Sequence, residues 1–586
     1  MRRTLRLIVA AALTFAAAAT PLFGQKINVV EKRLSNGMDL LVVRREGEAT
    51  VAGGWVAHVG SSNERPGITG ISHLFEHMMF KGTPTIGTKD YRQDVAVIAE
   101  QEKVRDEIRQ EEAKMRAAYR RGEIDDLLKP ENKTPRLREL EKKFDELVAK
   151  QRTVLVKNEF DRIYTTAGGS GMNAFTNEDM TGYFITVPSN KVELWMWMES
   201  ERLLHPVFRE FYSERDVVFE ERRLRTEATP LGKYEETFES MFWESHPYNW
   251  PVVGWPSDIP AITKAQADAY YATYYAPQNI TLILVGDLAP EKIAAGAERY
   301  FGRIPRGKSA VPDVVTLEVP QQAEKRLNAE AEANPQVDIL WHTVPFGHAD
   351  SYALQVLAQL LSTRTGRLYK GLVLGSQVAT EAFARQESRK WAGLFNAGGE
   401  AKEGHRPEEV EQAIYAEIDK LKKEDVPAEE LQKVKNNFAA SEYRRMSSNF
   451  PILIQLIQND GRGDWHEVNE AGTKVQAVTA ADVKRVANRY FTKENRAVAI
   501  YTRKAGTAAP EDPDLAGLDD RGRAMVKQLS QRLQTADDPE RLRQMLSQME
   551  SQSANAPPEM KPAMEVMRKK IQARIDELEK SKGKKG

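Results

Sequence analysis

The densest group of reactive side chains in this 586-residue sequence is "HLFEH", which places His73, Glu76 and His77 within five positions although the chain has only nine histidines. On an α-helix, His73 and His77 are one turn apart, so both imidazoles leave the same face and can bind one metal ion. Glu76 lies close enough to that face to hold a water molecule beside the ion. The alternative is an ordinary amphipathic helix on which two histidines happen to share a face. The apolar neighbours predict a buried helix, where such side chains need a metal or polar partners, so the pattern favours a metal site.

A third metal ligand must come from elsewhere, and the acidic segment "SERDVVFEERRLRTE" at 213–227 can supply it. Glu214 and Glu221 are seven residues apart, two helical turns along one face, whereas Glu220 is turned by about 100° from Glu221. This spacing lets Glu221 complete a zinc site that keeps a fourth position open for water, as catalytic zinc requires. Glu214 would support a ligand from behind. The alternative for so charged a segment is a solvated helix face.

Three segments together resemble the pitrilysin-like (M16) zinc metallopeptidases, the inverzincins, whose HxxEH reverses the commoner HExxH. These segments are "GSSNERPGITGISHLFEHMMFKGT", "GGSGMNAFTNEDMTGYFITVP" and "ERDVVFEE", and the resemblance extends over roughly residues 28–503. It implies one Zn²⁺ per chain and two related α+β domains. It also implies roles for seven residues: His73, His77 and Glu221 as zinc ligands, Glu76 as catalytic base, Glu214 as supporting glutamate, and Asn173 and Ala174 on the edge strand beside the bound peptide.

The sequence departs from the family pattern in two places. Glu221 follows His77 by 144 residues, about twice the usual separation, and a charged helical insertion at about 97–157 accounts for the excess. We expect two helices broken at 129–135; the insertion either projects as a hairpin or is a solvated segment without function. In the second domain, "GRLYKGLVLGSQVAT" at 366–380 has Val373 and Thr380 where the family carries a substrate-contacting Arg and Tyr. The resemblance therefore suggests a zinc-bearing subunit completed by a related M16 subunit that supplies the Arg/Tyr pair, or a homodimer.

An internal repeat supports the two-domain organisation. Residues 262–287 align without gaps on residues 478–503, and each copy reads as a helix, an aromatic pair, a turn with Asn and an apolar strand. We therefore predict an α+β fold with two tandem domains at 25–305 and 321–503, a linker at 306–320, and a linker with a helical tail at 504–586.

Composition limits the other possibilities. The chain has no cysteine, which excludes disulfides, thiolate metal ligands and a cysteine nucleophile, and its formal net charge of −1 gives no electrostatic support for nucleic-acid binding. Residues 1–24 run from arginines through an apolar core to small residues, as a signal peptide does. We expect export to the periplasm or secretion, without a permanent membrane anchor.

The sequence therefore predicts a zinc-dependent endopeptidase that cleaves extended or unfolded peptides with water activated by zinc and Glu76. The alternative is a catalytically retired M16-like subunit that serves in binding or assembly. Retention of the whole metal motif argues against retirement, and Val373 and Thr380 argue for it.

Overall fold

The computed structural model describes residues 26–127, 129–504, 518, 520–534, 536, 538–553 and 560–583. The predicted signal peptide and most of the connector after Lys504 lie outside these residues. The chain divides into two compact units, of which the first ends at Thr502. No helix in the described segments combines the length and apolarity that a membrane span needs.

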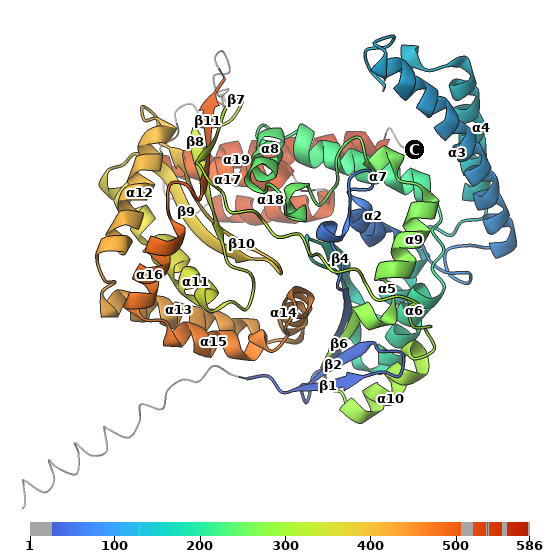
Figure 1. Cartoon of the computed structure of the whole chain (residues 1–586), viewed down its shortest axis with the longest axis horizontal. Coiled ribbons are helices and arrows are strands. Elements are labelled where there is room, and N and C mark those ends of the chain that lie inside the picture. Colours follow the sequence, from blue (N-terminus) through green and yellow to red (C-terminus); the bar gives the residue numbers. More distant parts are fainter. Residues whose placement is uncertain are drawn as a thin grey trace, which may run out of the picture. The chain divides into compact units, whose positions relative to one another are not determined.

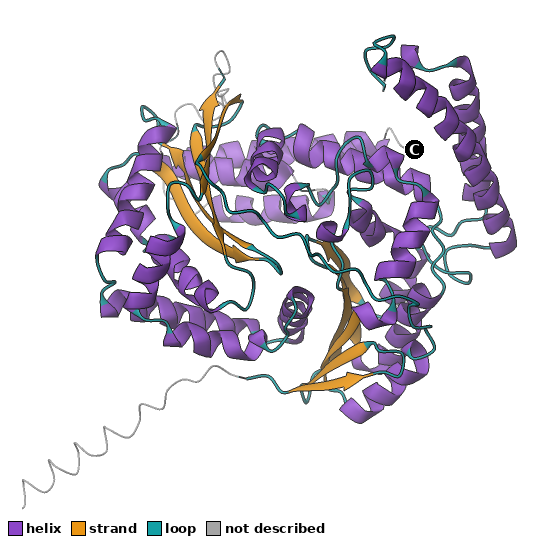
Figure 2. Cartoon of the chain, in the orientation of Figure 1, coloured by secondary structure: helices purple, strands orange, loops and turns teal. Residues whose placement is uncertain are grey.

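The first unit contains two sheets, each flanked by helices (Figures 1 and 2), which confirms the predicted α+β class. The first sheet has the order β1-β2-β6-β3-β5-β4, and its β2–β6 pair is parallel. Its strands are β1 (Val29–Arg33), β2 (Asp39–Arg44), β3 (Thr50–Ala57), β4 (Ser170–Thr176), β5 (Thr181–Pro188) and β6 (Ile280–Gly286). The helices of this half are α2 (Ile71–Met78), α3 (Tyr91–Arg120), α4 (Pro135–Arg152), α5 (Glu159–Thr166), α6 (Val192–Leu204), α7 (Phe211–Arg222), α8 (Gly232–Phe242), α9 (Lys264–Tyr274) and α10 (Pro290–Phe301).

The second half repeats this plan with a sheet of order β7-β11-β8-β10-β9. Its strands are β7 (Lys325–Ala331), β8 (Gln336–Thr343), β9 (Ala379–Ser388), β10 (Gly393–Ala401) and β11 (Arg496–Arg503). Its helices are α11 (Ala349–Leu361), α12 (Pro407–Lys423), α13 (Ala428–Arg445), α14 (Asn449–Arg462), α15 (Glu467–Ala477) and α16 (Ala480–Tyr490). The second unit contains α17 (Asp520–Gln534), α18 (Pro539–Ser553) and α19 (Lys561–Gly583). These helices lie in the segment for which the sequence predicts a helical tail.

The sequence repeat corresponds to one local structure built twice. In both copies a threonine caps the helix, Thr263 before α9 and Thr479 before α16. An asparagine amide then closes the turn before the strand: Asn279 donates to the Tyr274 carbonyl and Asn495 to the Tyr490 carbonyl, each at 2.8 Å. The shared polar residues are therefore those that begin the helix and close the turn between the helix and the strand that follows.

The two halves exchange helices. Helix α14 of the second half packs on the first sheet, where Leu453 and Leu456 join a core with Leu41 and Ile283. Helix α8 of the first half contributes Phe242 to a core on the second sheet. Each sheet thus has one face completed by a helix from the other half, because burying that apolar face requires a covering element.

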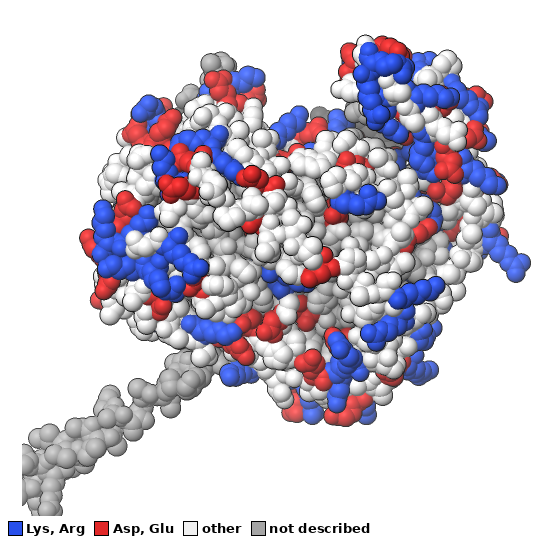
Figure 3. All heavy atoms as spheres, in the orientation of Figure 1, with Lys and Arg blue, Asp and Glu red and all other residues white. Residues whose placement is uncertain are grey.

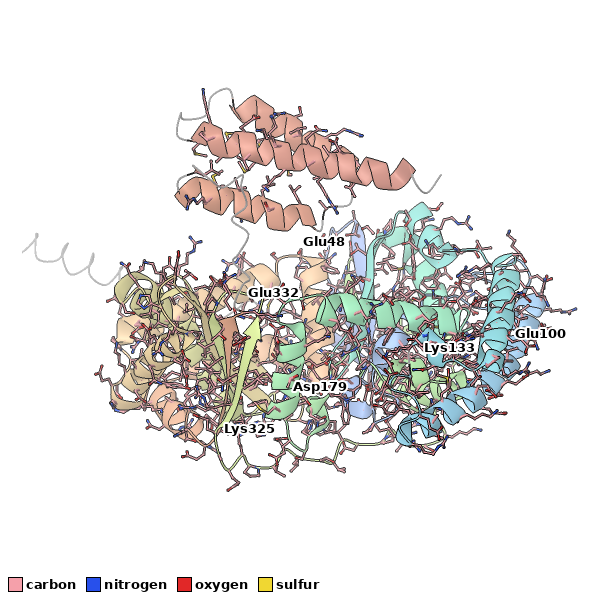
Figure 4. The ribbon with its side chains drawn as sticks, turned by 90° about the horizontal axis from the view of Figure 1, so that it is seen from above. Glu48, Glu100, Lys133, Asp179, Lys325 and Glu332 are labelled. Atoms are coloured by element: carbon pink, nitrogen blue, oxygen red, sulfur yellow. The ribbon has the colours of Figure 1, made fainter. Side chains whose placement is uncertain are left out.

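The insertion is a pair of long helices, α3 and α4, with a short 3₁₀ turn at Pro130–Asn132 between them. Glu100 and Lys133 mark the pair in Figure 4. The pair has its own small apolar core, which includes Ile108, Met115 and Leu140. Its surface mixes positive and negative side chains, as does the rest of the visible face (Figure 3).

Truncating the exchanged helix tests its role in the first sheet. Leu453 is fully buried, so Leu453→Ala should lower the free energy of unfolding by about 2–5 kcal/mol. Hydrogen exchange should increase in β3 and β6, because α14 covers them. Leu374→Ala, at a side chain that is 60% exposed, is the control and should change stability by no more than about 0.5 kcal/mol. Unchanged exchange in β3 would contradict the packing.

Candidate metal centre

The first turn of helix α2 is fixed by Gly70 and Glu64, which sets the directions of the helix's side chains. Gly70 caps the helix with φ 89°, and a Cβ there would lie 2.6 Å from the Val253 carbonyl oxygen, so only glycine fits. The buried carboxylate of Glu64 accepts hydrogen bonds from the backbone N–H groups of Gly70 at 2.8 Å and Ser72 at 2.7 Å. The two oxygens satisfy unpaired donors of the first turn, while burial raises the pKa of Glu64 to about 8.

His73, His77 and Glu221 come together between α2 and α7. Glu221 Oε2 lies 3.7 Å from His73 Nε2 and 3.3 Å from His77 Nε2. One ligand atom from each of the three residues can be chosen so that all lie within 4.8 Å of one another. The structure therefore brings together the three side chains that the sequence proposed as ligands.

The histidines differ in their surroundings. Burial, with smaller contributions from the neighbouring His77 and Arg225, lowers the pKa of His73 to about 3, which keeps its imidazole neutral. His77 is also desolvated, but its Nδ1–H donates to Glu214 Oε1 at 3.0 Å, and this carboxylate raises the pKa of His77 overall. In the neutral imidazole this hydrogen bond leaves the lone pair on Nε2, the nitrogen that lies beside Glu221 and that a metal would bind.

Glu214 supports His77 and is itself held. Burial alone would raise the pKa of Glu214, but the hydrogen bond from His77 and the charge of Lys81 outweigh this effect and lower it. Lys81, in the loop just after α2, forms an ion pair with Glu214 on α7. The carboxylate thus stays ionised and connects the two helices that carry the candidate ligands.

Glu76 points to the other side of the cluster, toward the edge strand. Thr176 at the end of β4 donates its hydroxyl to Glu76 Oε2 at 2.7 Å. Burial raises the pKa of Glu76, and this hydrogen bond opposes the rise. A half-buried carboxyl with one oxygen fixed and a raised pKa has the properties of a general base.

Strand β4 is an edge strand of the first sheet, and among the described residues it pairs with β5 alone. Asn173 is exposed and Ala174 is buried on this strand, and their register is shifted by a bulge after Ser170. An open strand edge presents backbone N–H and C=O groups to which an extended peptide can add. Asn173 and Ala174 lie in the wall of the cavity that also contains Glu76.

The donor set fits a zinc ion. Bonds of about 2.0–2.2 Å in tetrahedral geometry place neighbouring ligand atoms about 3.3 Å apart, close to the observed 3.3 and 3.7 Å. Arg225 pairs with Glu221 Oε1 at 2.6 Å, so Oε2 is the carboxylate oxygen that lies beside the imidazoles. His73 Nδ1 is buried and has no hydrogen-bond partner in the described part of the chain. Two imidazole nitrogens and one carboxylate oxygen match the His₂Glu set of catalytic zinc sites.

A cavity of about 490 Å³ opens beside Glu76 and His77. Its walls come from the loop after α2, from strand β4, from the segment before α7, and from the end of the helical insertion at Leu155–Asn158. The cavity is large enough for a bulky side chain of a bound peptide.

Val373 and Thr380 do not take over the roles of an Arg and a Tyr. Val373 packs against the core of the second half, and Thr380 donates its hydroxyl to Glu400 at 2.9 Å. Arg367, the nearest retained arginine of the motif, is bound to Glu430 through two hydrogen bonds of 2.9 and 2.7 Å.

Several positioning residues were not singled out from the sequence: Glu64, Lys81, Thr176 and Arg225. Glu64 had a local signal, since an acidic residue shortly before a glycine and an apolar run is typical of a capped helix start. The other three contact residues distant in sequence or lie in a charged run, so spacing alone gave no signal.

Two protein-family models match parts of this chain. Residues 40–106 match the family model described as "Insulinase (Peptidase family M16)", and residues 261–438 match "Peptidase M16 inactive domain". The zinc protease PqqE of Helicobacter pylori is 29% identical over 362 residues, which are 59% of this chain and 79% of that protein.

Two solved structures extend the likeness. A protease from Helicobacter pylori superposes with a TM-score of 0.66 at 22% identity, covering 81% of this chain and 100% of that chain. The periplasmic protease PqqL from Escherichia coli gives 0.58 at 15% identity, covering 83% of this chain but 49% of that chain. The segment matched as inactive contains none of the five residues gathered at the metal centre, which are His73, Glu76, His77, Glu214 and Glu221.

Removing candidate ligands should remove zinc. We expect one zinc per wild-type chain and loss of bound metal in Glu221→Gln, because the substitution removes the negative charge that lies beside both imidazoles. Glu214→Gln should weaken zinc binding by about 10–100-fold, since His77 loses its charged partner. Elemental analysis and chelator competition measure both effects without substrate.

Glu220→Gln is the matched control. Glu220 is adjacent to Glu221, exposed, and paired with Arg223, so zinc affinity should not change. Equal zinc content in Glu221→Gln and Glu220→Gln would refute the assigned ligand set.

Proposed function

Since the chain belongs to the pitrilysin-like M16 family of peptidases, we propose that it is a zinc-dependent endopeptidase that hydrolyses extended or unfolded peptides. The observation that carries the proposal is the position of Glu76: it adjoins the three candidate ligands and is hydrogen-bonded to the last residue of an open edge strand. Zinc bound by His73, His77 and Glu221 would supply a Lewis acid that activates water and polarises the peptide carbonyl.

The protein's own residues supply binding and proton transfer. The edge of β4 would add the substrate backbone as a further strand, which aligns an extended peptide along Asn173 and Ala174. Glu76 would take a proton from the attacking water and deliver it to the leaving amine nitrogen. Thr176 holds one oxygen of Glu76, so the other oxygen can face the water.

The location of the chain and its assembly belong to the same proposal. The pattern of residues 1–24 supports export to the periplasm or secretion. The chain spans about half the length of PqqL, and Val373 and Thr380 stand where the family has an Arg and a Tyr. We propose that a related M16 subunit supplies this pair. A second copy of this chain would bring the same Val and Thr, so a homodimer would not supply it.

Glu76→Gln separates a peptidase from a retired binding subunit. The variant keeps the shape of the side chain but cannot accept a proton, so we expect kcat/KM to fall by about 10²–10⁴-fold while zinc content stays at the wild-type level. Cleavage is measured with a mixed library of internally quenched, unstructured peptides. Glu220→Gln should cleave like the wild type.

The same assay tests the need for a partner. The isolated zinc-loaded chain should show little cleavage until a related subunit carrying the Arg/Tyr pair is added. Full activity of a monodisperse preparation of the chain alone would contradict the two-chain proposal. A folded, zinc-loaded chain that stays inactive with such a subunit would favour the binding or assembly role instead.

A further inference from the structure

A buried polar network ties the base of the helical insertion to the segment just before α7. Arg209, 1% exposed, forms an ion pair with Asp94 of α3, which is fully buried. Gln151 at the end of α4, also 1% exposed, donates to the other Asp94 oxygen at 2.8 Å. Buried polar groups satisfied in this way fix geometry, because leaving any one of them without its partner is costly.

The same arginine also fixes the loop after α2. Its guanidinium donates to the carbonyl oxygens of Lys81 at 3.1 Å and Ile86 at 3.0 Å, and it also donates to that of Thr83. Arg209 lies just before α7, so one side chain connects the loop after the candidate metal helix, the start of α7 and the stem of the insertion.

The two legs of the insertion are also joined through their backbones. Lys89 N–H donates to the Val154 carbonyl at 2.8 Å, and Val156 N–H donates to the Gly87 carbonyl at 3.0 Å. These hydrogen bonds hold the segment after α4 in an extended conformation. Its residues Leu155–Asn158 form one wall of the cavity beside Glu76.

One charged side chain of this wall is at the cavity. Lys157 lines the cavity and is exposed, and within the described residues no hydrogen bond or ion pair involves its ammonium group. The other lining cations are occupied: Lys81 pairs with Glu214, and Arg209 pairs with Asp94. Among the lining carboxylates, the Glu210 side chain likewise forms no hydrogen bond or ion pair with the described part of the chain, and it supplies an opposing charge.

We infer that the insertion determines substrate specificity: Lys157, held at the cavity wall by the insertion stem, selects a negatively charged side chain at a position next to the scissile bond. The negative charge of Glu210, which also lines the cavity, weakens this preference for an acidic side chain. The inference rests on the proposed peptidase function, because it identifies which peptides the same site prefers.

The test measures cleavage and binding separately. Zinc-loaded full-length chain, with its complementing subunit where one is needed, is given position-scanned quenched peptides that differ only in carrying Asp, Asn or Lys near the scissile bond. Binding of the same peptides is measured by fluorescence anisotropy on the Glu76→Gln form, which does not depend on turnover.

We expect the wild type to prefer Asp over Lys at one position by about fivefold, the size of a partly exposed ion pair. Lys157→Glu should reverse the order, and Glu210→Gln should increase the preference for Asp. Lys142→Glu, an exposed charge reversal on the same insertion away from the cavity, should leave the profile unchanged.

An identical profile in wild type and Lys157→Glu, in both cleavage and binding, would overturn the inference. A charge-dependent binding profile without any cleavage would instead contradict the proposed function while supporting the role of Lys157. The two failures are therefore distinguishable.

Discussion

The site depends on one constraint: α2 and α7 must stay at a fixed distance, because the candidate ligands come from both helices. Glu214 of α7 makes two interactions with the α2 side of this gap: it accepts a hydrogen bond from His77 and forms an ion pair with Lys81. The two carboxylates lie seven residues apart on one face of α7 and have different roles. Glu221 faces the imidazole nitrogens, and Glu214 holds the ring that presents one of them.

The apolar framework sets this distance before any metal binds. Phe75 and Leu74 of α2 are buried in the main core of the first half, and Tyr183 of β5 donates its hydroxyl to the Phe75 carbonyl at 3.2 Å. The helix is thereby seated on the sheet, and its polar face is left for chemistry. The buried Glu64 at its start shows that even the first turn is built from paired groups.

Sequence reasoning predicted what local periodicity encodes. The spacing of His73 and His77, the seven-residue spacing of Glu214 and Glu221, the helical insertion and the repeat before β6 and β11 all correspond to features of the structure. These signals work because helical and strand periods translate directly into faces.

The contacts that fix the site were not predictable in the same way. Arg209 reaches Asp94 across more than a hundred residues, and Thr176 reaches Glu76 across a similar separation. The exchange of α8 and α14 also left no local signal, because an amphipathic helix does not specify which sheet it covers. The assigned roles of Asn173, Ala174, Glu76 and the three ligands remain predictions, of which the experiments above address those of Glu76 and Glu221.

The exchange of helices also governs the order in which the chain can fold. Leu41 is synthesised early, yet the core that buries it includes Leu456, more than four hundred residues later in the sequence. An N-terminal half that emerges first therefore has an uncovered apolar sheet until α14 arrives. Such a high contact order implies slow folding and a long-lived intermediate prone to association, so the nascent protein should depend on a holding chaperone.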